Sequence, residues 1–281
     1  MNAYQAIHGL LSRALADRNV HILGEALELS PTTRGLMAQA PSRVHLLPAA
    51  DASLVGVGVG LALSGARPVI SLSGPDALWG VLQQLGQEAA PLRAAGDFIA
   101  PIVLRVPLAP GEIVPVAMLC AIEGIIVASP ATPEDAVSMV QAALDADRPV
   151  VLLEPRDVLS ARMDSEPEQR PLTEARIVQP GEHASILAWG AAVRVAREAA
   201  AVLEAEGIFA EVIDLRAITP LDVETVAESV SRTGRPVVVG GPEETLLAAV
   251  RAAFLRLESP PAHALGNTEA LTEAVRRAVH Y

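Results

Sequence analysis

The amino-acid sequence predicts an α/β protein made of two layered domains with mostly parallel sheets. Three observations support this fold class. The chain has 281 residues, which is the length of about two domains of roughly 150 residues each. Short runs of Val, Ile and Leu alternate along it with longer Ala-rich runs of helical period. The short runs are apolar on both faces, which is typical of parallel strands covered by helices on both sides.

The first half of the chain carries the expected strands of one domain, separated by helices with their own start signals. Thr132 is expected to cap a helix over 134–146. Pro133 suits the first turn of that helix, and the acids Glu134 and Asp135 suit the positive end of its dipole. The strands are expected at 19–23, 44–47, 68–72, 101–105, 124–128 and 149–153.

A change of composition separates the two halves. Residues 156–170 are charged and contain no long apolar run, which is typical of a surface linker. We therefore predict a first domain over 1–165, a linker over 166–180 and a second domain over 181–281. The second domain repeats the α/β pattern, with strands expected at 184–189, 210–215 and 236–240 and helices at 191–206, 222–231, 243–257 and 268–279.

Composition argues against several classes of protein. Hydrophobic residues make up 51% of the chain and aromatic residues 2%, so the core has to be built from Ala, Val, Leu and Ile. The net charge of -12 argues against binding to nucleic acid or to an anionic membrane surface. The longest uncharged apolar stretch, 52–66, is shorter than the ~20 residues that span a bilayer. The single cysteine, Cys120, cannot form an internal disulfide, which favours a reducing, cytoplasmic setting.

Few short motifs carry chemistry by themselves. Gly56, Gly58 and Gly60 resemble part of a dinucleotide fingerprint, but they lie inside an expected helix rather than in a strand-to-helix turn. We interpret them as small residues that let another backbone approach closely. The six histidines show no metal-ligand spacing, so we predict structural roles for His21 and His45 and no metal site. The sequence contains neither a Gly-x-Ser-x-Gly elbow nor a phosphate-binding P-loop.

Several blocks of sequence together carry a family resemblance. The first is D-A-S-L-V-G-V-G-V-G at 51–60, followed by G-A-R-P-V at 65–69. The most specific blocks of the second half are A-W-G at 188–190, E-V-I-D-L-R at 211–216 and P-L-D at 220–222. Further blocks lie at 22–25, 87–90, 101–105, 124–130 and 149–155. Over nearly the whole chain they resemble the beta subunit of the decarboxylating component of 2-oxo acid dehydrogenase complexes, a transketolase-like family that uses thiamine diphosphate.

The resemblance implies a fold, a cofactor and partners. It implies a transketolase pyrimidine-type domain followed by a transketolase C-terminal-type domain. The chain would bind the pyrimidine half of thiamine diphosphate, and an alpha-type partner chain would hold the diphosphate and its magnesium. In the family a glutamate at the position of Asp51 binds the aminopyrimidine ring and so activates the thiazolium carbon, which makes Asp51 the implied catalytic residue. The implied cofactor-binding residues are Glu25, Asp51, Pro75, Ala77 and Trp79.

The acid of the implied site departs from the family pattern. Asp51 is one methylene shorter than glutamate, which withdraws its carboxylate by about 1.5 Å. A misplacement of about 1 Å can cost roughly 100-fold in rate. In the alternative interpretation Asp51 caps the helix that follows it and takes no part in catalysis.

Two further departures concern an aromatic ring and a histidine. Pro75 or Ala77 stands where the family packs an aromatic ring on the aminopyrimidine, and Trp79 replaces that ring only if the loop shifts. The family also carries histidines in the loop after the next strand, whereas this sequence has none between Leu47 and Glu182. A residue for general acid–base chemistry is therefore missing from that loop.

Two main hypotheses about function follow. In the first, the chain is the beta-type subunit of a thiamine-diphosphate-dependent 2-oxo acid dehydrogenase and works with an alpha-type partner. In the second, it is a catalytically degenerate relative that acts as a scaffold or regulatory subunit. A third, another transketolase-like enzyme, lacks a histidine set for sugar phosphates. We also expect a homodimer that is inactive alone, because the family places the cofactor between chains and Gly56 and Gly60 share one face of an expected helix.

Overall fold

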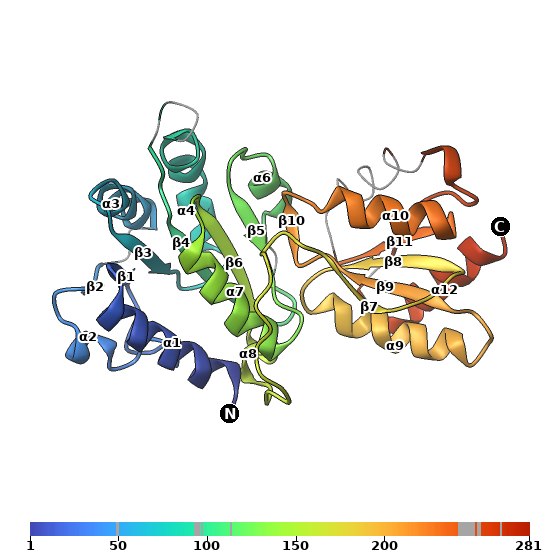
Figure 1. Cartoon of the computed structure of the whole chain (residues 1–281), viewed down its shortest axis with the longest axis horizontal. Helices are drawn as coiled ribbons and strands as arrows, with labels where there is room; N and C mark the ends of the chain where they lie inside the picture. The colour runs from blue at the N-terminus through green and yellow to red at the C-terminus, as the bar shows by residue number, and fades with distance from the viewer. Residues whose placement is uncertain are drawn as a thin grey trace. The chain divides into compact units, whose positions relative to one another are not determined.

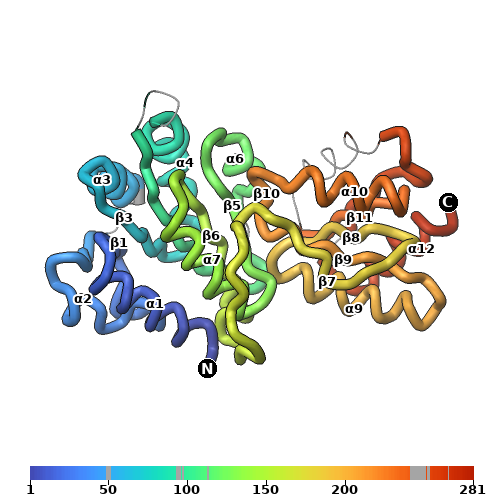
Figure 2. Tube along the Cα trace, in the orientation of Figure 1, coloured from blue at the N-terminus to red at the C-terminus, as the bar shows by residue number. Residues whose placement is uncertain are grey.

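A computed structural model describes residues 1–48, 51–92, 96, 98–112, 114–240, 251, 254–264 and 266–281 (Figure 1). The chain divides into two compact units, Met1–Leu172 and Thr173–Tyr281. Each unit is a layered α/β structure with a mostly parallel sheet, and the path of the chain through it can be followed in Figure 2. The fold class predicted from the sequence is confirmed.

The first unit is built on a parallel sheet. Its strands run in the order β5-β6-β4-β3-β1-β2, and every neighbouring pair is parallel. The strands are short and apolar, and each begins and ends close to the range predicted for it. They are β1 (Val20–Gly24), β2 (Val44–Leu46), β3 (Arg67–Ser71), β4 (Val103–Leu108), β5 (Ile126–Ala128) and β6 (Val150–Pro155).

Helices cover both faces of this sheet. The chain moves along the sheet in one direction from β2 to β3 and from β3 to β4, and in the opposite direction from β1 to β2 and from β5 to β6. Because crossovers between parallel strands are right-handed, α3 and α4 cover one face and α2 and α7 the other. The helices are α1 (Ala3–Asp17), α2 (Leu36–Gln39), α3 (Asp51–Leu63), α4 (Ala77–Gln84), the π-helix η1 (Leu85–Ala89), α6 (Val116–Cys120), α7 (Pro133–Asp145) and α8 (Arg156–Ser160).

In the described part of this unit, side-chain caps start α1 and α7. The hydroxyl of Thr132 accepts a hydrogen bond of 3.1 Å from the backbone N–H of Asp135, as the sequence predicts. Helix α1 was not expected from the sequence. Asn2 caps it by accepting from the backbone of Gln5, whose side chain in turn accepts from the backbone of Asn2. This reciprocal capping box is a local signal that could have revealed the helix.

Helix α3 packs on the sheet through a glycine. A Cβ atom at Gly58 would lie 2.8 Å from Cδ1 of Ile70 on β3, so only glycine fits without a shift. A Cβ at Gly56 would meet only the Gln84 side-chain oxygen, at 3.8 Å, and one at Gly60 would meet nothing within 4 Å. The close approach predicted for this helix is therefore made by Gly58 within the unit, and Gly56 and Gly60 have room around them.

The second unit carries a mixed sheet in the order β12-β11-β8-β9-β7. Strand β7 is antiparallel to β9, and the other neighbouring pairs are parallel. The strands are β7 (Arg176–Gln179), β8 (Ala184–Ala188), β9 (Ala210–Asp214), β11 (Pro236–Val239) and β12 (Ala262–Ala264), and β10 spans Ala217–Thr219. The helices are α9 (Ala192–Glu204), α10 (Val223–Thr233), the 3-10 helix η2 (Phe254–Arg256) and α12 (Thr268–Val279).

Two sequence-based expectations concern the linker between the domains and the third helix predicted for the second half. Within the predicted linker, 166–180, the last residues form β7 and join the second sheet. The three predicted domain ranges remain predictions. The helix expected over 243–257 falls mostly on residues 243–250, 252 and 253, which lie outside the described part of the chain.

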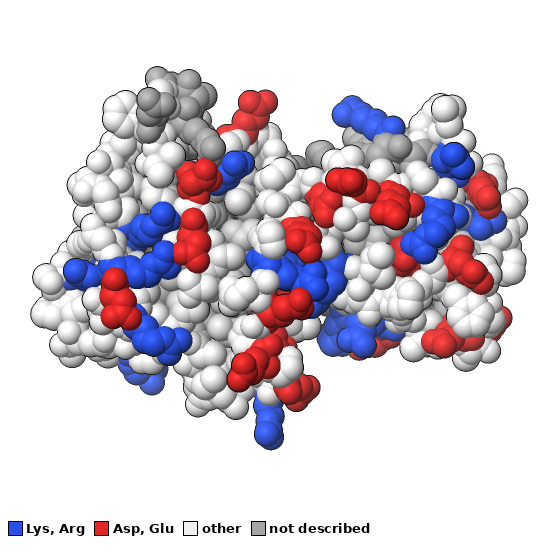
Figure 3. Space-filling view, in the orientation of Figure 1, with Lys and Arg blue, Asp and Glu red and all other residues white. Residues whose placement is uncertain are grey.

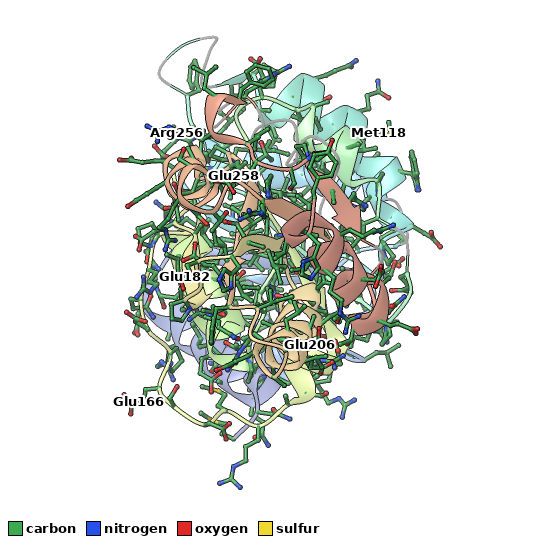
Figure 4. The ribbon with its side chains drawn as sticks, turned by 90° about the vertical axis from the view of Figure 1, so that its right-hand side faces the viewer. Met118, Glu166, Glu182, Glu206, Arg256 and Glu258 are labelled. Atoms are coloured by element: carbon green, nitrogen blue, oxygen red, sulfur yellow. The ribbon has the colours of Figure 1, made fainter. Side chains whose placement is uncertain are left out.

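A surface ion pair joins two helices of the second unit. Glu206, which follows α9 and is labelled in Figure 4, accepts two hydrogen bonds from the guanidinium of Arg276 on α12, of 2.9 and 2.6 Å. Aliphatic side chains of both helices, among them Leu203 of α9 and Val275 of α12, are buried in the core, which is built from such residues as the composition predicts. In the part of the chain that the structure describes, no helix has the length and apolar character needed to cross a membrane.

Candidate functional site

The carboxyl edge of the first sheet contains a point where the direction of the chain reverses. Strands β1 and β3 are neighbours there, with Gly24 opposite Ser71. The segment after β1 leads to β2 on one side, and the segment after β3 leads to β4 on the other. In open α/β sheets, ligands bind outside the carboxyl ends of the strands at such a reversal. This edge is therefore the candidate site.

Glu25 is the first residue after β1 and lies half-buried at this edge. The residue before it has to be glycine, because a Cβ at Gly24 would lie 2.7 Å from the carbonyl oxygen of Ser71 and 2.8 Å from Cδ2 of Leu27. The backbone N–H of Leu47 donates a 3.0 Å hydrogen bond to the Gly24 carbonyl, which brings the segment after β2 to the same edge.

Pro75, Ala77 and Trp79 follow β3. Pro75 lies in the turn before α4 and Ala77 begins that helix, and both residues are buried. Trp79 lies two residues further along α4 and is 58% exposed. Because β3 pairs with β1, this segment and Glu25 leave the sheet from neighbouring strands. The fold thus brings the two predicted segments to one edge.

Asp51 is the first residue of α3. Its side chain lies outside the described part of the structure, as do residues 49 and 50 before it. The helix itself starts after β2, whose end lies beside β1. The backbone position of Asp51 therefore belongs to the same edge, and its catalytic role stays a prediction.

A buried ion pair beneath this edge was missed by the sequence analysis. Arg105 on β4 donates two hydrogen bonds of 2.8 Å, one to each carboxylate oxygen of Glu154 on β6. A third nitrogen of the guanidinium donates to the hydroxyl of Thr32, at 2.9 Å. The Arg105 and Glu154 side chains are 3% and 5% exposed. The only signal in the sequence is one basic and one acidic residue at the ends of two otherwise apolar runs.

The surroundings of this pair also perturb a tyrosine. Burial raises the pKa of the Tyr4 hydroxyl on α1. The charge of Arg156 opposes that shift, and the charge of Glu154 adds to it. Tyr4 therefore stays a neutral hydroxyl beside the ion pair at physiological pH.

Charged residues of both signs are mixed on the face of the molecule that Figure 3 shows. On the face seen in Figure 3, blue Lys or Arg atoms alternate with red Asp and Glu atoms over both units. Among the residues that the structure describes, no group of three or more His, Cys, Asp and Glu side chains is placed to hold a metal ion.

Comparison with protein families matches both units. Residues 4–161 match the family described as "Transketolase, pyrimidine binding domain", and residues 173–278 match "Transketolase, C-terminal domain". A solved structure entitled "Split gene transketolase, inactive beta4 tetramer" is similar in fold, with a TM-score of 0.84 at 21% identity, over 100% of this chain and 98% of that one.

Curated relatives resemble the chain over most of its length. The pyruvate dehydrogenase E1 component subunit beta of Acholeplasma laidlawii is 32% identical, over 99% of this chain and 92% of the relative. The protein of the same name from Bacillus subtilis is 32% identical, over 85% and 79%. The 2-oxoisovalerate dehydrogenase subunit beta of Pseudomonas aeruginosa is 34% identical, over 73% and 66%.

The fold and the family matches define a transketolase-type protein with a pyrimidine-binding domain and a C-terminal domain. Within that class, the chain belongs to the family of the E1 beta subunits of 2-oxo acid dehydrogenases. The resemblance inferred from the sequence blocks is confirmed, and the relatives do not favour the alternative of a scaffold or regulatory subunit.

Proposed function

We propose that this chain is the beta-type subunit of a thiamine-diphosphate-dependent 2-oxo acid dehydrogenase and decarboxylates a 2-oxo acid oxidatively with an alpha-type partner. The observation that carries the proposal is the position of Glu25 and Pro75 after neighbouring strands of a pyrimidine-type sheet. Ligands of open α/β sheets bind at such a place. The names of the relatives supply the reaction class.

The residues at this edge fit the pyrimidine half of the cofactor. A carboxylate can accept a hydrogen bond from an N–H group of the ring, and Glu25 is a half-buried carboxylate at the reversal. Pro75 and Ala77 supply apolar surface beside it, and Trp79 at the start of α4 is the aromatic side chain nearest to them along the chain. When bound, the cofactor supplies a carbon nucleophile for the 2-oxo group. Asp51 would hold the proton at the ring nitrogen.

The proposed partners follow from the proposal that this chain holds only the pyrimidine half of the cofactor. The diphosphate and its magnesium would be held by the alpha-type chain. The chain would also pair with a second copy of itself, because Gly56 and Gly60 leave room on α3 for another helix. A homodimer is the commonest symmetric assembly. The single cysteine of the sequence favours a cytoplasmic location.

The test is calorimetric titration of thiamine diphosphate and magnesium into this protein alone and after co-expression with an alpha-type chain of a 2-oxo acid dehydrogenase. We expect binding, and turnover of pyruvate or a branched-chain 2-oxo acid, only in the pair. Steady turnover by the pure beta chain would contradict the proposal that this chain holds only half of the cofactor site. A pair that binds the cofactor but turns over none of these acids would contradict the proposed reaction. Sedimentation at micromolar concentration tests the homodimer, and a monomer there would exclude it.

A further inference from the structure

The guanidinium of Arg105 connects the middle of the first sheet to the segment that carries Glu25. Two of its nitrogens hold the Glu154 carboxylate, and the third donates to the hydroxyl of Thr32. Thr32 belongs to the chain between β1 and α2 and is 2% exposed. Because a bidentate arginine–carboxylate pair fixes the plane of the guanidinium, the bond to Thr32 has one direction in space.

The hydrogen bonds continue from Thr32 toward the end of β1. The hydroxyl of Thr33 donates a buried hydrogen bond of 2.7 Å to the carbonyl of Leu27. Leu27 in turn lies against Gly24, the last residue of β1, so closely that a Cβ there would be 2.8 Å away. Glu25 and Ala26 are therefore bracketed by two anchors, the strand end at Gly24 and the fixed position of Leu27.

The backbone of the same arginine holds the other segment of the candidate site. The N–H of Leu72 donates a 3.0 Å hydrogen bond to the carbonyl oxygen of Arg105. Leu72 follows β3 and leads directly into the turn that contains Pro75. One residue thus fixes the chain after β1 through its side chain and the chain after β3 through its backbone.

We propose that Arg105 is a positioning residue, which through Thr32 and Leu72 holds Glu25 and the Pro75 turn in register for the pyrimidine ring. The proposal rests on the proposed function. The described hydrogen bonds of Arg105 go to Glu154, Thr32 and Leu72 and not to these two side chains, so its effect passes through the segments that carry them. Such pre-organisation improves binding because less of the site has to be ordered when the ligand arrives.

The test uses one variant that breaks the link and three controls. Thr32→Val keeps the shape of the side chain but removes the hydroxyl, which accepts the Arg105 bond and also lies 3.0 Å from the Ser30 hydroxyl. Thr32→Ser keeps the hydroxyl, and Ser30→Ala removes only the bond between Ser30 and Thr32. Ser129→Ala is the matched control, because the Ser129 hydroxyl also makes a buried side-chain hydrogen bond, of 2.8 Å to the Leu153 carbonyl, but lies outside the two segments. It should lower the melting temperature about as much as Thr32→Val does.

The first readout is amide hydrogen exchange in this chain alone. In Thr32→Val we expect exchange at residues 25–31 to rise about tenfold, as expected for the loss of one buried hydrogen bond from a local opening equilibrium. Thr32→Ser should restore the wild-type rate, and Ser129→Ala should leave these residues unchanged. Equal rates in Thr32→Val and the wild type, or an equal rise in Ser30→Ala or in Ser129→Ala, would overturn the proposal.

The second readout is the KM for thiamine diphosphate against kcat in the reconstituted pair. A positioning role raises this KM in Thr32→Val about tenfold while Ser129→Ala leaves it unchanged. If exchange rises but KM does not, the segments are fixed for another reason and the proposal is overturned. If the wild-type pair binds no cofactor, the proposed function fails, and the exchange readout still decides whether Arg105 holds the segment after β1.

Discussion

His21 on β1 and His45 on β2 form a hydrogen bond with each other. The Nδ1 atom of His21 and the Nε2 atom of His45 are 3.0 Å apart, and the planes of the two rings differ by 7°. One nitrogen has to carry a hydrogen and the other a lone pair, so the bond is lost when both rings are fully protonated. The pair therefore joins the edge strand β2 to the sheet in a pH-dependent way.

The pair predicts a loss of stability in weak acid. Burial lowers the pKa of His21 from its usual value near 6.5, and the neighbouring His45 and Arg43 lower it further. Below pH ~6.5 the unfolded chain then binds a proton that the folded chain does not. The contribution of His21 to the free energy of unfolding is fully present above that pH and falls as the pH decreases toward the pKa of His21 in the folded state. Urea unfolding at pH 7.5 and 5.5 should show a larger loss for the wild type than for His21→Gln, and equal losses would contradict the interpretation.

Removing one partner of the buried ion pair should be costly. Arg105→Met leaves the carboxylate of Glu154 buried without its bidentate partner, which costs about 3–5 kcal/mol. Replacing both residues with apolar ones, in Arg105→Met with Glu154→Leu, should recover most of that loss because no buried charge remains. Urea denaturation of the two proteins checks the prediction. A double variant less stable than the single one would show that the apolar replacements do not fit.

Two glycines of α3 should respond to alanine in opposite ways. Gly58→Ala places a Cβ against Ile70 on β3, and overpacking of this kind costs about 1–3 kcal/mol. Gly60→Ala meets nothing within 4 Å and should stabilise the helix by about 0.5–1 kcal/mol. Thermal unfolding of both variants checks this prediction. If both are destabilised equally, the open space at Gly60 is filled in solution, as it would be in a dimer that uses this face.

Variants of Asp51 distinguish a catalytic role of this residue from a role as the cap of helix α3. In the reconstituted pair, Asp51→Ala should abolish turnover, and Asp51→Glu should retain or raise it because its carboxylate reaches about 1.5 Å further. A residue that only caps α3 would instead change stability by about 1 kcal/mol and leave kcat unchanged. Steady-state kinetics and unfolding of both variants provide the comparison. Full activity of Asp51→Ala removes this residue from the mechanism.

The layered α/β fold could be predicted because its signals are local. The apolar runs locate the strands, and Thr132 caps α7 through a contact with Asp135, three residues away. The resemblance of the sequence blocks to the family predicted that Glu25, Pro75 and Ala77 belong to one site. The pairing of β1 with β3 brings the segments that carry them to one edge of the sheet. Helix α1 was missed although its capping box is equally local.

The sequence by itself determined the strands, most of the helices, the aliphatic core and the family, because periodicity, caps and sequence blocks depend on residues close together in the chain. Only the tertiary structure decided which distant residues meet. Arg105 lies 73 residues from Thr32 and 49 from Glu154, and His21 lies 24 from His45. The tertiary structure also decided that Gly58, rather than Gly56 or Gly60, packs against Ile70. Such contacts depend on sheet order and register, which bring together side chains that no local pattern links.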